Sequence, residues 1–562
     1  MCAIAGFLHR TQPADRGALS RLTDAMAHRG PDGQGLWLEG PVGLGHRRLA
    51  ILDLSDAGRN PMGYGGEDGQ RYWIVYNGEI YNYLELRSVL QAAGHRFRTA
   101  TDTEVVVAAF DQWGLDCLPR FNGMWAFAIW DRQEHRLVLA RDRFGIKPLY
   151  YTQDDERFVF ASELKAFASL DGFTRALDGE QAAATLDGLN AAEGEGPRTL
   201  MAGVLRLMPG HAMVVEPDKT LRVTRWWETR DHVPAVPERY EEQVEAFRAL
   251  LVDAVRLRLR SDRPVGASLS GGVDSGAIAS VMAMLRKETG SDVHAFVATF
   301  PGTELDERPY ADAVVAGGGI TPHYWAFEPQ GALSDVLDSI WAMEDVWSTI
   351  AVPMWSLYRE MRRRNITVSL DGHGGDELLC GYHWFLDWPM GVVNDNLYRA
   401  VHVDPLPAIL RNFDRCSMAH GVEVRMPLLD WRLVCFAFGL PPAAKVGGGY
   451  TKRILRDAMA GIMPEAVRRR RSKLGFNSPM VTWFNGALRP LIRTVLDHPL
   501  WLESPWWDGP VLRREILDRS EAGTWTSEDW DGVLRHWTRM NLVLWRLLFV
   551  EGERLDRLRW AS

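Results

Sequence analysis

The first residue whose chemistry needs an explanation is Cys2, which stands between the initiator methionine and the apolar stretch AIAGF. A thiol in this place can belong to a signal peptide, to a buried first strand or to a catalytic nucleophile. The signal peptide is excluded, because no basic segment precedes the apolar run and His9 and Arg10 interrupt it after a few residues. The strand and the nucleophile remain, and they make different predictions about the rest of the chain.

A loop with the composition of a phosphate-binding site follows an apolar run at residues 268–276, SLSGGVDSG. Its small side chains let backbone N–H groups surround a phosphate, and the N-terminus of the helix that follows adds a partial positive charge. Asp274 beside a phosphate implies a cation between them, so Mg²⁺ is expected. The loop lacks the ending of a Walker sequence, and its SGGxDS string is instead the signature of ATP pyrophosphatases, which split ATP between the α and β phosphates. A Gly-rich turn with a helix cap is the weaker alternative.

A second acidic loop, DGHGGDELLCGY at residues 371–382, follows the apolar run ITVSL. Its glycines let the backbone approach a ligand closely, and Asp376 and Glu377 offer carboxylates. Asp274 and Asp376, each after a strand, are expected to hold Mg²⁺ on the pyrophosphate from two sides. An acidic surface turn is the alternative, and the glycines around the carboxylates favour a site.

The elements that would position these residues differ between the two halves of the chain. The first half reads as short strands with interleaved helices, such as YLELRSVLQAAG, and the stretch FAIWDRQEHRLVLARD predicts a hairpin. Asn77 and Gly78, at the end of RYWIVYNG, form a dipeptide that favours a tight turn with positive φ.

After residue 228 a polar, Pro-bearing linker, DHVPAVPERYEEQ, leads into a helix. Strands and helices then alternate: PVGASL, GAIASVMAMLRKE, VHAFVATF, ERPYADAVVAG and RNITVSL. This alternation predicts a parallel sheet with ligands at the carboxyl ends of its strands. The last third is rich in helix, and we expect its many tryptophans to pack within helices rather than to stack on bases.

The composition sets limits on the class of protein. At 562 residues the chain is expected to form two or more domains, and its 46% hydrophobic and 24% charged residues are typical of a soluble globular protein. A net charge of -9 argues against a nucleic-acid partner, and no apolar stretch is long enough for a membrane span. Five cysteines without CxxC spacing indicate a reducing, cytoplasmic setting.

Ten motifs together resemble the glutamine-hydrolysing asparagine synthetase family, almost from end to end. In chain order they are AHRGPDGQG, HRRLAILDLS, NGEIYN, TDTE, RDRFGIKPLYY, SLSGGVDS, LDGHGGDELLCGY, DRCSMAHGVEVRMPLLD, YTKRILRDAM and RRSKLGFNSP, after the opening Cys2. The resemblance implies an α+β N-terminal nucleophile hydrolase sandwich over residues 1–228. It also implies an α/β parallel-sheet ATP pyrophosphatase-like domain with a helical C-terminal part over residues 240–562.

The resemblance also implies the reaction. Glutamine hydrolysed at the first site would yield ammonia, which travels through the protein to an acceptor carboxylate activated by ATP as its acyl-adenylate, and there displaces AMP. The expected partners are therefore glutamine, ATP with Mg²⁺, and an acceptor carboxylate, with L-aspartate as the default; a homodimer is left open.

In the first domain the family match assigns roles that make chemical sense. Met1 would be removed, leaving Cys2 as nucleophile with its own α-amine, of pKa about 8, as the base. Asn77 and the Gly78 N–H would form the oxyanion hole, and Asp102 would meet the α-ammonium of glutamine. Arg48 suits a bidentate contact with the α-carboxylate. The full glutamine-binding set predicted in this way is Arg48, Leu49, Ile51, Leu52, Asn77, Gly78, Glu79 and Asp102.

In the second domain the match assigns Lys452 to charge stabilisation during adenylation and ammonia attack. Asp274 and Asp376 are the predicted metal ligands. The basic run Arg468–Arg471, continued by Lys473, predicts either a solvated basic face or a loop beside the pyrophosphate. The predicted ATP-binding set is Leu269, Ser270, Gly271, Gly272, Asp274, Ser275, Ala298, Asp371 and Gly372.

The acidic loop departs from the family pattern, since His373 replaces a glutamate and Asp371 replaces a serine. His373 can take a proton near neutrality and is included among the catalytic residues with Cys2, Asn77, Gly78 and Lys452, although it cannot hold an ammonium group as a carboxylate does. A merely tolerated histidine is the alternative.

Two further readings remain beside the aspartate amidotransferase. The same chemistry on a specialised natural-product or peptide carboxylate is one. An amide-forming cyclase that needs no glutamine is the other, and the presence of Cys2, Arg48 and Asp102 argues against it.

Overall fold

The structure is a computed structural model that describes residues 2–66, 70–188, 192–290, 292–301, 306–327, 334–471 and 478–553. The N-terminal part holds two six-stranded sheets whose described strands pair antiparallel. In sheet order, the first consists of β10 (Leu205–Arg206), β8 (Tyr150–Gln153), β9 (Arg157–Ala161), β1 (Ala3–His9), β3 (Val42–Arg48) and β2 (Gly33–Glu39). The second consists of β12 (Leu221–Arg225), β11 (His211–Val215), β7 (Arg136–Arg141), β6 (Gly123–Asp131), β5 (Tyr72–Ile80) and β4 (Met62–Tyr64).

The alternation of side chains along β1 shows how these sheets are layered. Ile4 and Leu8 belong to the core between the two sheets, which also contains residues of β5, β6 and β7. Ala5 and Phe7 point to the opposite face, where α1 (Arg16–Asp24) covers the first sheet. Helices α2 (Tyr83–Ala92) and α3 (Asp102–Trp113) cover the outer face of the second sheet. The four layers confirm the predicted sandwich of antiparallel sheets between helices.

The tight turn predicted at Asn77 and Gly78 is wrong. Both residues lie inside β5, paired with Ala126 and Trp125 of β6. The glycine is required by close packing rather than by a turn, because a Cβ on Gly78 would lie 2.4 Å from the carbonyl oxygen of Met124. The nine-residue ladder to β6 thus outweighs the local preference of the dipeptide. The hairpin predicted further on is correct, with β6 and β7 as its arms.

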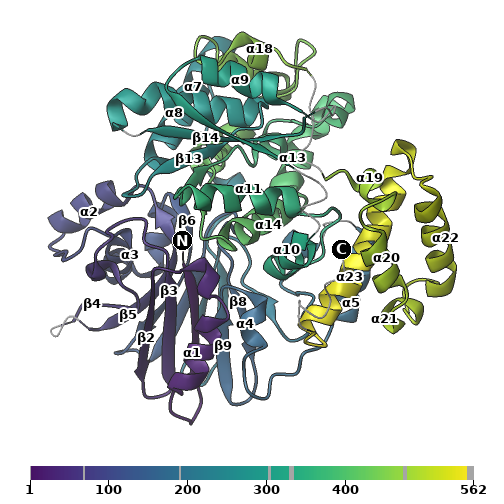
Figure 1. Cartoon of the computed structure of the whole chain (residues 1–562). Helices are drawn as coiled ribbons and strands as arrows, with labels where there is room; N and C mark the ends of the chain where they lie inside the picture. The colour runs from purple at the N-terminus through teal and green to yellow at the C-terminus, as the bar shows by residue number, and fades with distance from the viewer. Residues whose placement is uncertain are drawn as a thin grey trace.

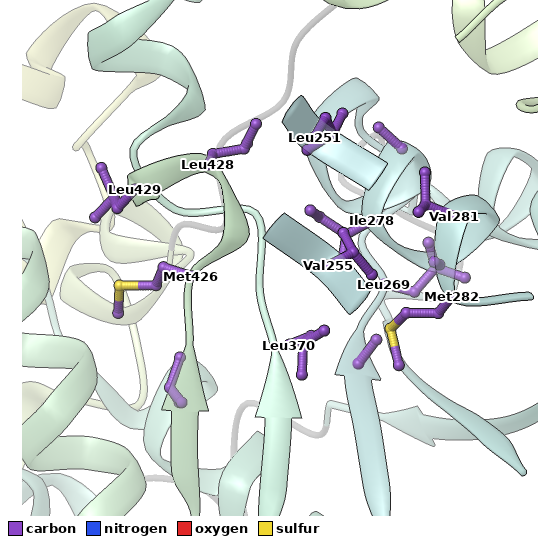
Figure 2. Packing of buried hydrophobic residues seen from close by; sticks show 14 of the residues in the cluster. Leu251, Val255, Leu269, Ile278, Val281, Met282, Leu370, Met426, Leu428 and Leu429 are labelled. Atoms are coloured by element: carbon purple, nitrogen blue, oxygen red, sulfur yellow. The ribbon is translucent and has the colours of Figure 1, made fainter. Parts of the chain in front are cut away.

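The middle of the chain forms the predicted parallel sheet. Its order is β15 (Ile320–Ala326), β14 (Val293–Thr299), β13 (Val265–Ser268), β16 (Val368–Leu370) and β17 (Glu423–Arg425), and these neighbouring strands pair in parallel. Helices α7 (Tyr240–Arg258), α8 (Val273–Thr289), α9 (Arg308–Ala316) and α11 (Val352–Arg363) accompany it. Figure 2 shows Leu251 and Val255 of α7 and Ile278 of α8 packed around the apolar residues at the strand ends. The edge strands β15 and β17 were not predicted, since one contains a proline and a histidine and the other spans three residues.

Further helices connect these parts and form the C-terminal third. They are α4 (Leu164–Phe167), α5 (Gly179–Asp187), α6 (Ala192–Glu195), α10 (Val336–Met343), α12 (Gly375–Leu378), α13 (Val393–His402), α14 (Leu406–Met418), α15 (Trp431–Gly439), α16 (Pro442–Lys445), α17 (Arg453–Ala458), α18 (Glu465–Arg468), α19 (Met480–Phe484), α20 (Arg489–Leu496), α21 (Pro499–Leu502), α22 (Gly509–Ala522) and α23 (Trp530–Phe549). In Figure 1 the helices from α19 onward stand together beside the rest of the molecule.

Trp501, Trp530, Trp537 and Trp545 of this C-terminal third lie in helices, as predicted, whereas Trp506, Trp507 and Trp525 lie in the segments between helices. Trp483, Trp501, Trp537 and Trp545 are fully buried, and the indole N–H of Trp545 donates to the carbonyl of Glu344 at 2.9 Å. Trp560 lies outside the described residues. Over the described ranges, we find no helix with both the length and the apolar character that a bilayer crossing demands.

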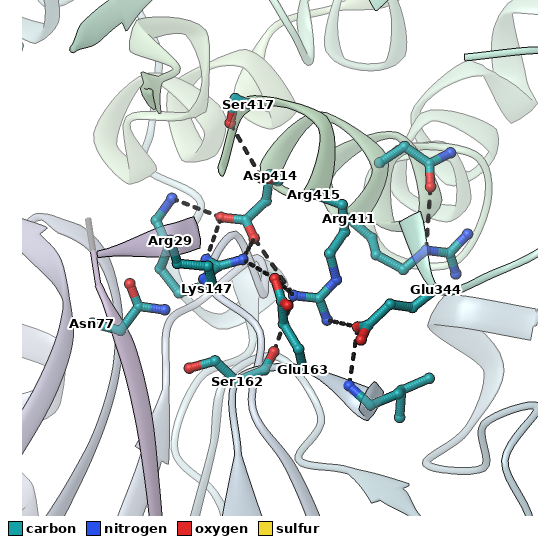
Figure 3. Close-up of polar contacts among 12 residues, drawn as sticks. Arg29, Asn77, Lys147, Ser162, Glu163, Glu344, Arg411, Asp414, Arg415 and Ser417 are labelled. Atoms are coloured by element: carbon teal, nitrogen blue, oxygen red, sulfur yellow. Dashed lines mark hydrogen bonds and ion pairs between the residues drawn. The ribbon is translucent and has the colours of Figure 1, made fainter. Parts of the chain in front are cut away.

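A network of buried charges joins the sandwich to the parallel-sheet part (Figure 3). Arg29 lies 2.9 Å from Asp414 of α14 and 2.8 Å from Glu163, and Lys147 lies 3.4 Å from the same Asp414. Arg415 lies 3.2 Å from Glu163. These five side chains are at most 2% exposed, so each charge depends on its partners for compensation.

This network makes a prediction about stability. Asp414→Ala leaves Arg29 and Lys147 buried without their shared carboxylate, and we expect it to lower the free energy of unfolding by about 3–5 kcal/mol. Denaturant unfolding followed by tryptophan fluorescence measures the change. The control is Asp171→Ala, which removes an ion pair with Arg21 that is largely exposed and is worth at most about 1 kcal/mol. Equal effects of the two substitutions would contradict the structural role of the network.

Candidate active sites

Cys2 lies at the wall of a cavity in the sandwich, immediately before β1. The structure brings to this cavity nearly all of the predicted glutaminase residues, from the loop after β3, from β5 and from the start of α3. Those that line it are Cys2, Arg48, Leu49, Ile51, Leu52, Gly78, Glu79 and Asp102. Sequence reasoning missed His46, Tyr76, Thr101 and Thr103, which also line it.

The remaining predicted residue, Asn77, holds the backbone of Cys2. The backbone nitrogen of Cys2 donates to Asn77 Oδ1 at 3.0 Å. The Asn77 Nδ2 is buried and has no hydrogen-bond partner among the residues that the structure describes. The amide is therefore held through its oxygen to the backbone of Cys2, and its Nδ2 keeps an unused donor. Burial raises the pKa of the Cys2 thiol, although the positive chain terminus acts in the opposite direction.

Arg29 contacts the backbone of Cys2, and Arg48 lines the Cys2 cavity. The Arg29 Nε donates to the Cys2 carbonyl at 3.1 Å, so the same guanidinium binds the backbone of Cys2 and Asp414. Arg29 stands in the motif AHRGPDGQG, which does not by itself predict this contact. Arg48 donates to the carbonyl of Ser55 at 2.6 Å and to that of Asp53, which orients its guanidinium along the cavity wall.

Two carboxyl groups in the cavity have unusual acidity. Asp102 accepts hydrogen bonds from the Tyr76 hydroxyl at 2.8 Å and the Ile80 N–H at 2.9 Å, yet burial raises its pKa to about 6. Burial and the neighbouring Asp102 raise the pKa of Glu79 well above its usual value. Arg425 of β17 approaches Glu79 to 3.7 Å, so the parallel sheet contributes a cation to the edge of this cavity.

The second cluster lies at the carboxyl ends of β13 and β16. The predicted phosphate loop runs between the end of β13 at Ser268 and the start of α8 at Val273, as the sequence predicts. The acidic loop after β16 packs directly on it, since a Cβ on Gly372 would lie 2.7 Å from the Cβ of Asp274. The loops therefore form a continuous surface, in which Leu269 is buried and Ala298 of β14 is half-buried.

Lys452 joins the two predicted metal ligands. Its Nζ lies 2.6 Å from Asp376 and forms a further short contact with Asp274. Burial disfavours the ammonium, but the two carboxylates outweigh it and raise the pKa of Lys452 above its usual value. Lys452 is only 4% exposed, so it is not a lysine on the solvent face of a helix. The carboxylate oxygens of Asp274 and Asp376 are hard donors that fit Mg²⁺ shared with phosphate oxygens.

One arginine of the basic run reaches the phosphate loop. Arg470 is 5% exposed, donates to the carbonyl of Gly271 at 3.2 Å and pairs with Glu307. Arg468 instead pairs with Glu465 at 2.6 Å. The run is thus divided between a structural ion pair and a contact to the loop, and Lys473 lies outside the described residues.

Asp371 and His373 follow β16. The Asp371 carboxylate is 1% exposed and accepts hydrogen bonds from the hydroxyls of Tyr358 at 2.6 Å and Ser369 at 2.5 Å. The side chain is therefore occupied within the protein, and only the backbone of Asp371 could contact a nucleotide. The His373 Nε2 lies 3.3 Å from Asp371 Oδ2, and its ring centroid lies 3.6 Å from that of Phe413 in α14.

Comparisons with known proteins agree with this pair of sites. Residues 1–227 match the glutamine amidotransferase domain family, and residues 246–402 and 392–545 match the asparagine synthase family. Asparagine synthetase (glutamine-hydrolyzing) 1 of Bacillus subtilis is 27% identical over 98% of this chain and 97% of its own. A putative asparagine synthetase (glutamine-hydrolyzing) 2 of Methanocaldococcus jannaschii is 34% identical over 73% of this chain and 79% of its own. Amidase chry2 of Gibberella zeae is 30% identical over 68% of this chain and 60% of its own.

Three observations lead to one assignment. They are the sandwich with Cys2 at its cavity, the parallel sheet with its predicted phosphate loop, and the matches over nearly the whole length of the chain. The chain belongs to the glutamine-hydrolysing asparagine synthetase family, a family of amidotransferase enzymes.

Proposed function

We propose that the protein uses ATP and glutamine to convert L-aspartate into L-asparagine, releasing AMP and pyrophosphate. The observation that carries the proposal is the convergence of Cys2 and the predicted glutamine-binding residues on one cavity. The cluster of Lys452, Asp274 and Asp376 at the strand ends supports the second half of the reaction.

In the first half-reaction the Cys2 thiol attacks the side-chain amide of glutamine and its proton passes to the α-amine of the mature terminus. This requires removal of Met1, which lies outside the described residues. Negative charge develops on the amide oxygen, and the free Asn77 Nδ2 is the donor that stabilises it. Ammonia leaves, and water hydrolyses the thioester.

In the second half-reaction the acceptor carboxylate attacks the α-phosphorus of ATP and pyrophosphate leaves. The protonated Lys452 stabilises the charge that develops on the phosphates, and the N–H groups of residues 269–272 bind them. Mg²⁺, when bound to Asp274 and Asp376, would neutralise the pyrophosphate. Ammonia then attacks the acyl-adenylate and His373 takes up the surplus proton.

A different acceptor is the second candidate function. His373 offers an imidazole where an ammonium-binding carboxylate would be expected, and the carboxylate of Asp371 is occupied by Tyr358 and Ser369. Relatives of this chain include a protein named an amidase as well as asparagine synthetases. A carboxylic acid without an α-ammonium group would fit this loop.

ATP–pyrophosphate exchange distinguishes the two acceptors. With ATP and Mg²⁺, we expect L-aspartate to support exchange above the level without acceptor, because its carboxylate forms the acyl-adenylate reversibly. Succinate and N-acetylaspartate serve as matched acids without the α-ammonium. Exchange with either of these acids and none with aspartate would show that the aspartate assignment is wrong.

Replacement of the nucleophile tests the division of labour between the sites. Cys2→Ala should abolish product formation from glutamine, while free ammonia still supports it at close to the wild-type rate, because the thiol acts only in the first half-reaction. Product is measured by chromatography with each nitrogen source. Glutamine-driven product in this variant would refute a nucleophilic Cys2.

The acidity of Asp102 predicts a pH dependence of glutamine binding. The carboxyl group must be ionised to pair with an ammonium, and with a pKa of about 6 it becomes protonated as the pH falls through that value. The KM for glutamine should therefore rise about tenfold per unit below pH 6. Glutaramate, which lacks the α-ammonium, is the control, and its inhibition constant should not show this rise. A KM that stays constant down to pH 5 would contradict the pairing.

A further inference from the structure

The Asp371 carboxylate is surrounded by hydrogen-bond donors. It accepts hydrogen bonds from Tyr358 of α11 and from Ser369 of β16, and the backbone N–H of Ser268 lies 3.3 Å from its Oδ1. Burial alone would raise its pKa, but these donors and His373 outweigh burial and lower it. Asp371 is thus a fixed anion at the end of the central strands.

The imidazole of His373 is held between this anion and an aromatic ring. Its Nε2 lies 3.3 Å from Asp371 Oδ2, an ion-pair distance without hydrogen-bond alignment. On the other side the Phe413 ring contacts it, with ring centroids 3.6 Å apart. With Nε2 at 3.3 Å from a carboxylate, the geometry favours the neutral tautomer that carries its proton on Nε2, which leaves the lone pair on Nδ1.

We propose that Asp371 is a positioning residue for the amide-forming step, which orients His373 so that its Nδ1 accepts the proton released when ammonia attacks the acyl-adenylate. The inference rests on the proposed function, because it assigns a partner to the base of that reaction. The C–N bond forms as ammonia adds to the carbonyl carbon, and one proton passes from nitrogen to Nδ1. The C–O bond to the phosphate then breaks, and its electron pair leaves with AMP. The amide, AMP and a protonated His373 are the products.

The test separates the two half-reactions in Asp371→Asn, which preserves the shape of the side chain, removes its charge and replaces one of its two accepting oxygens by an NH2 group. Pyrophosphate exchange should fall by a much smaller factor than amide formation, since adenylation precedes the step that uses His373. The kcat for ammonia-driven amide formation should fall about 10- to 100-fold with little change in the KM for ammonia. L-Aspartate is the acceptor, or the acid that replaces it in the exchange panel.

A double-mutant cycle distinguishes positioning from a structural role. If Asp371 acts through His373, adding Asp371→Asn to His373→Gln should reduce the rate no further. Tyr358→Phe is the structural control, because it removes a buried hydrogen bond from Asp371 but leaves its charge beside the imidazole. Parallel losses of exchange and amide formation in Asp371→Asn, similar to those in Tyr358→Phe, would overturn the proposal, as would additive effects in the cycle.

The tautomer of His373 can be measured without any acceptor, so this measurement tests the role of Asp371 independently of the proposed function. In histidine-labelled wild-type protein, ¹⁵N NMR should show His373 as the Nε2–H tautomer, assigned by the loss of its signal in His373→Gln. Asp371→Asn should change the tautomer ratio. A wild-type enzyme inactive with every acid would refute the proposed function, whereas an unchanged tautomer in Asp371→Asn would refute only the role of Asp371.

Discussion

The structure depends on the pairing of Arg29 with Asp414. Both side chains are buried where the sandwich meets α14, at a distance of 2.9 Å, and neither is more than 2% exposed. A buried charge is tolerated only with its partners in place, so a displacement of one part against the other, which would separate Arg29 from Asp414, is costly. Because Arg29 also holds the Cys2 carbonyl, the contact that fixes the two parts relative to each other also fixes the backbone of the proposed nucleophile.

Helix α14 extends this constraint to the second site. Phe413 contacts His373, and its neighbour Asp414 binds Arg29, so two consecutive residues connect the proposed nucleophile of one reaction to the proposed base of the other. The start of the chain lies between the sandwich and the parallel-sheet part (Figure 1), and Arg425 of β17 reaches the edge of the Cys2 cavity.

Local sequence patterns predicted the layers and most of the residues gathered at each site. They could not predict contacts between residues that are far apart in the sequence. The apolar run AIAGF predicts a buried strand and SGGxDS predicts a loop between strand and helix, because both depend on neighbours in sequence. The turn at Asn77 failed because pairing with β6 decides that segment's conformation. Arg29 could not be placed from sequence, since its partner Asp414 is 385 positions away. Likewise, only the fold shows that Lys452 lies between two carboxylates.

We propose that ammonia formed at Cys2 is used at the second site without mixing with solvent. To test this, glutamine labelled with ¹⁵N in its side-chain amide is supplied together with an excess of unlabelled ammonium, and the isotope in the product amide is determined by mass spectrometry. If ammonia is transferred inside the protein, the product carries ¹⁵N far above the share of glutamine-derived ammonia in the bulk pool. A product whose isotope content follows the bulk pool would rule out internal transfer.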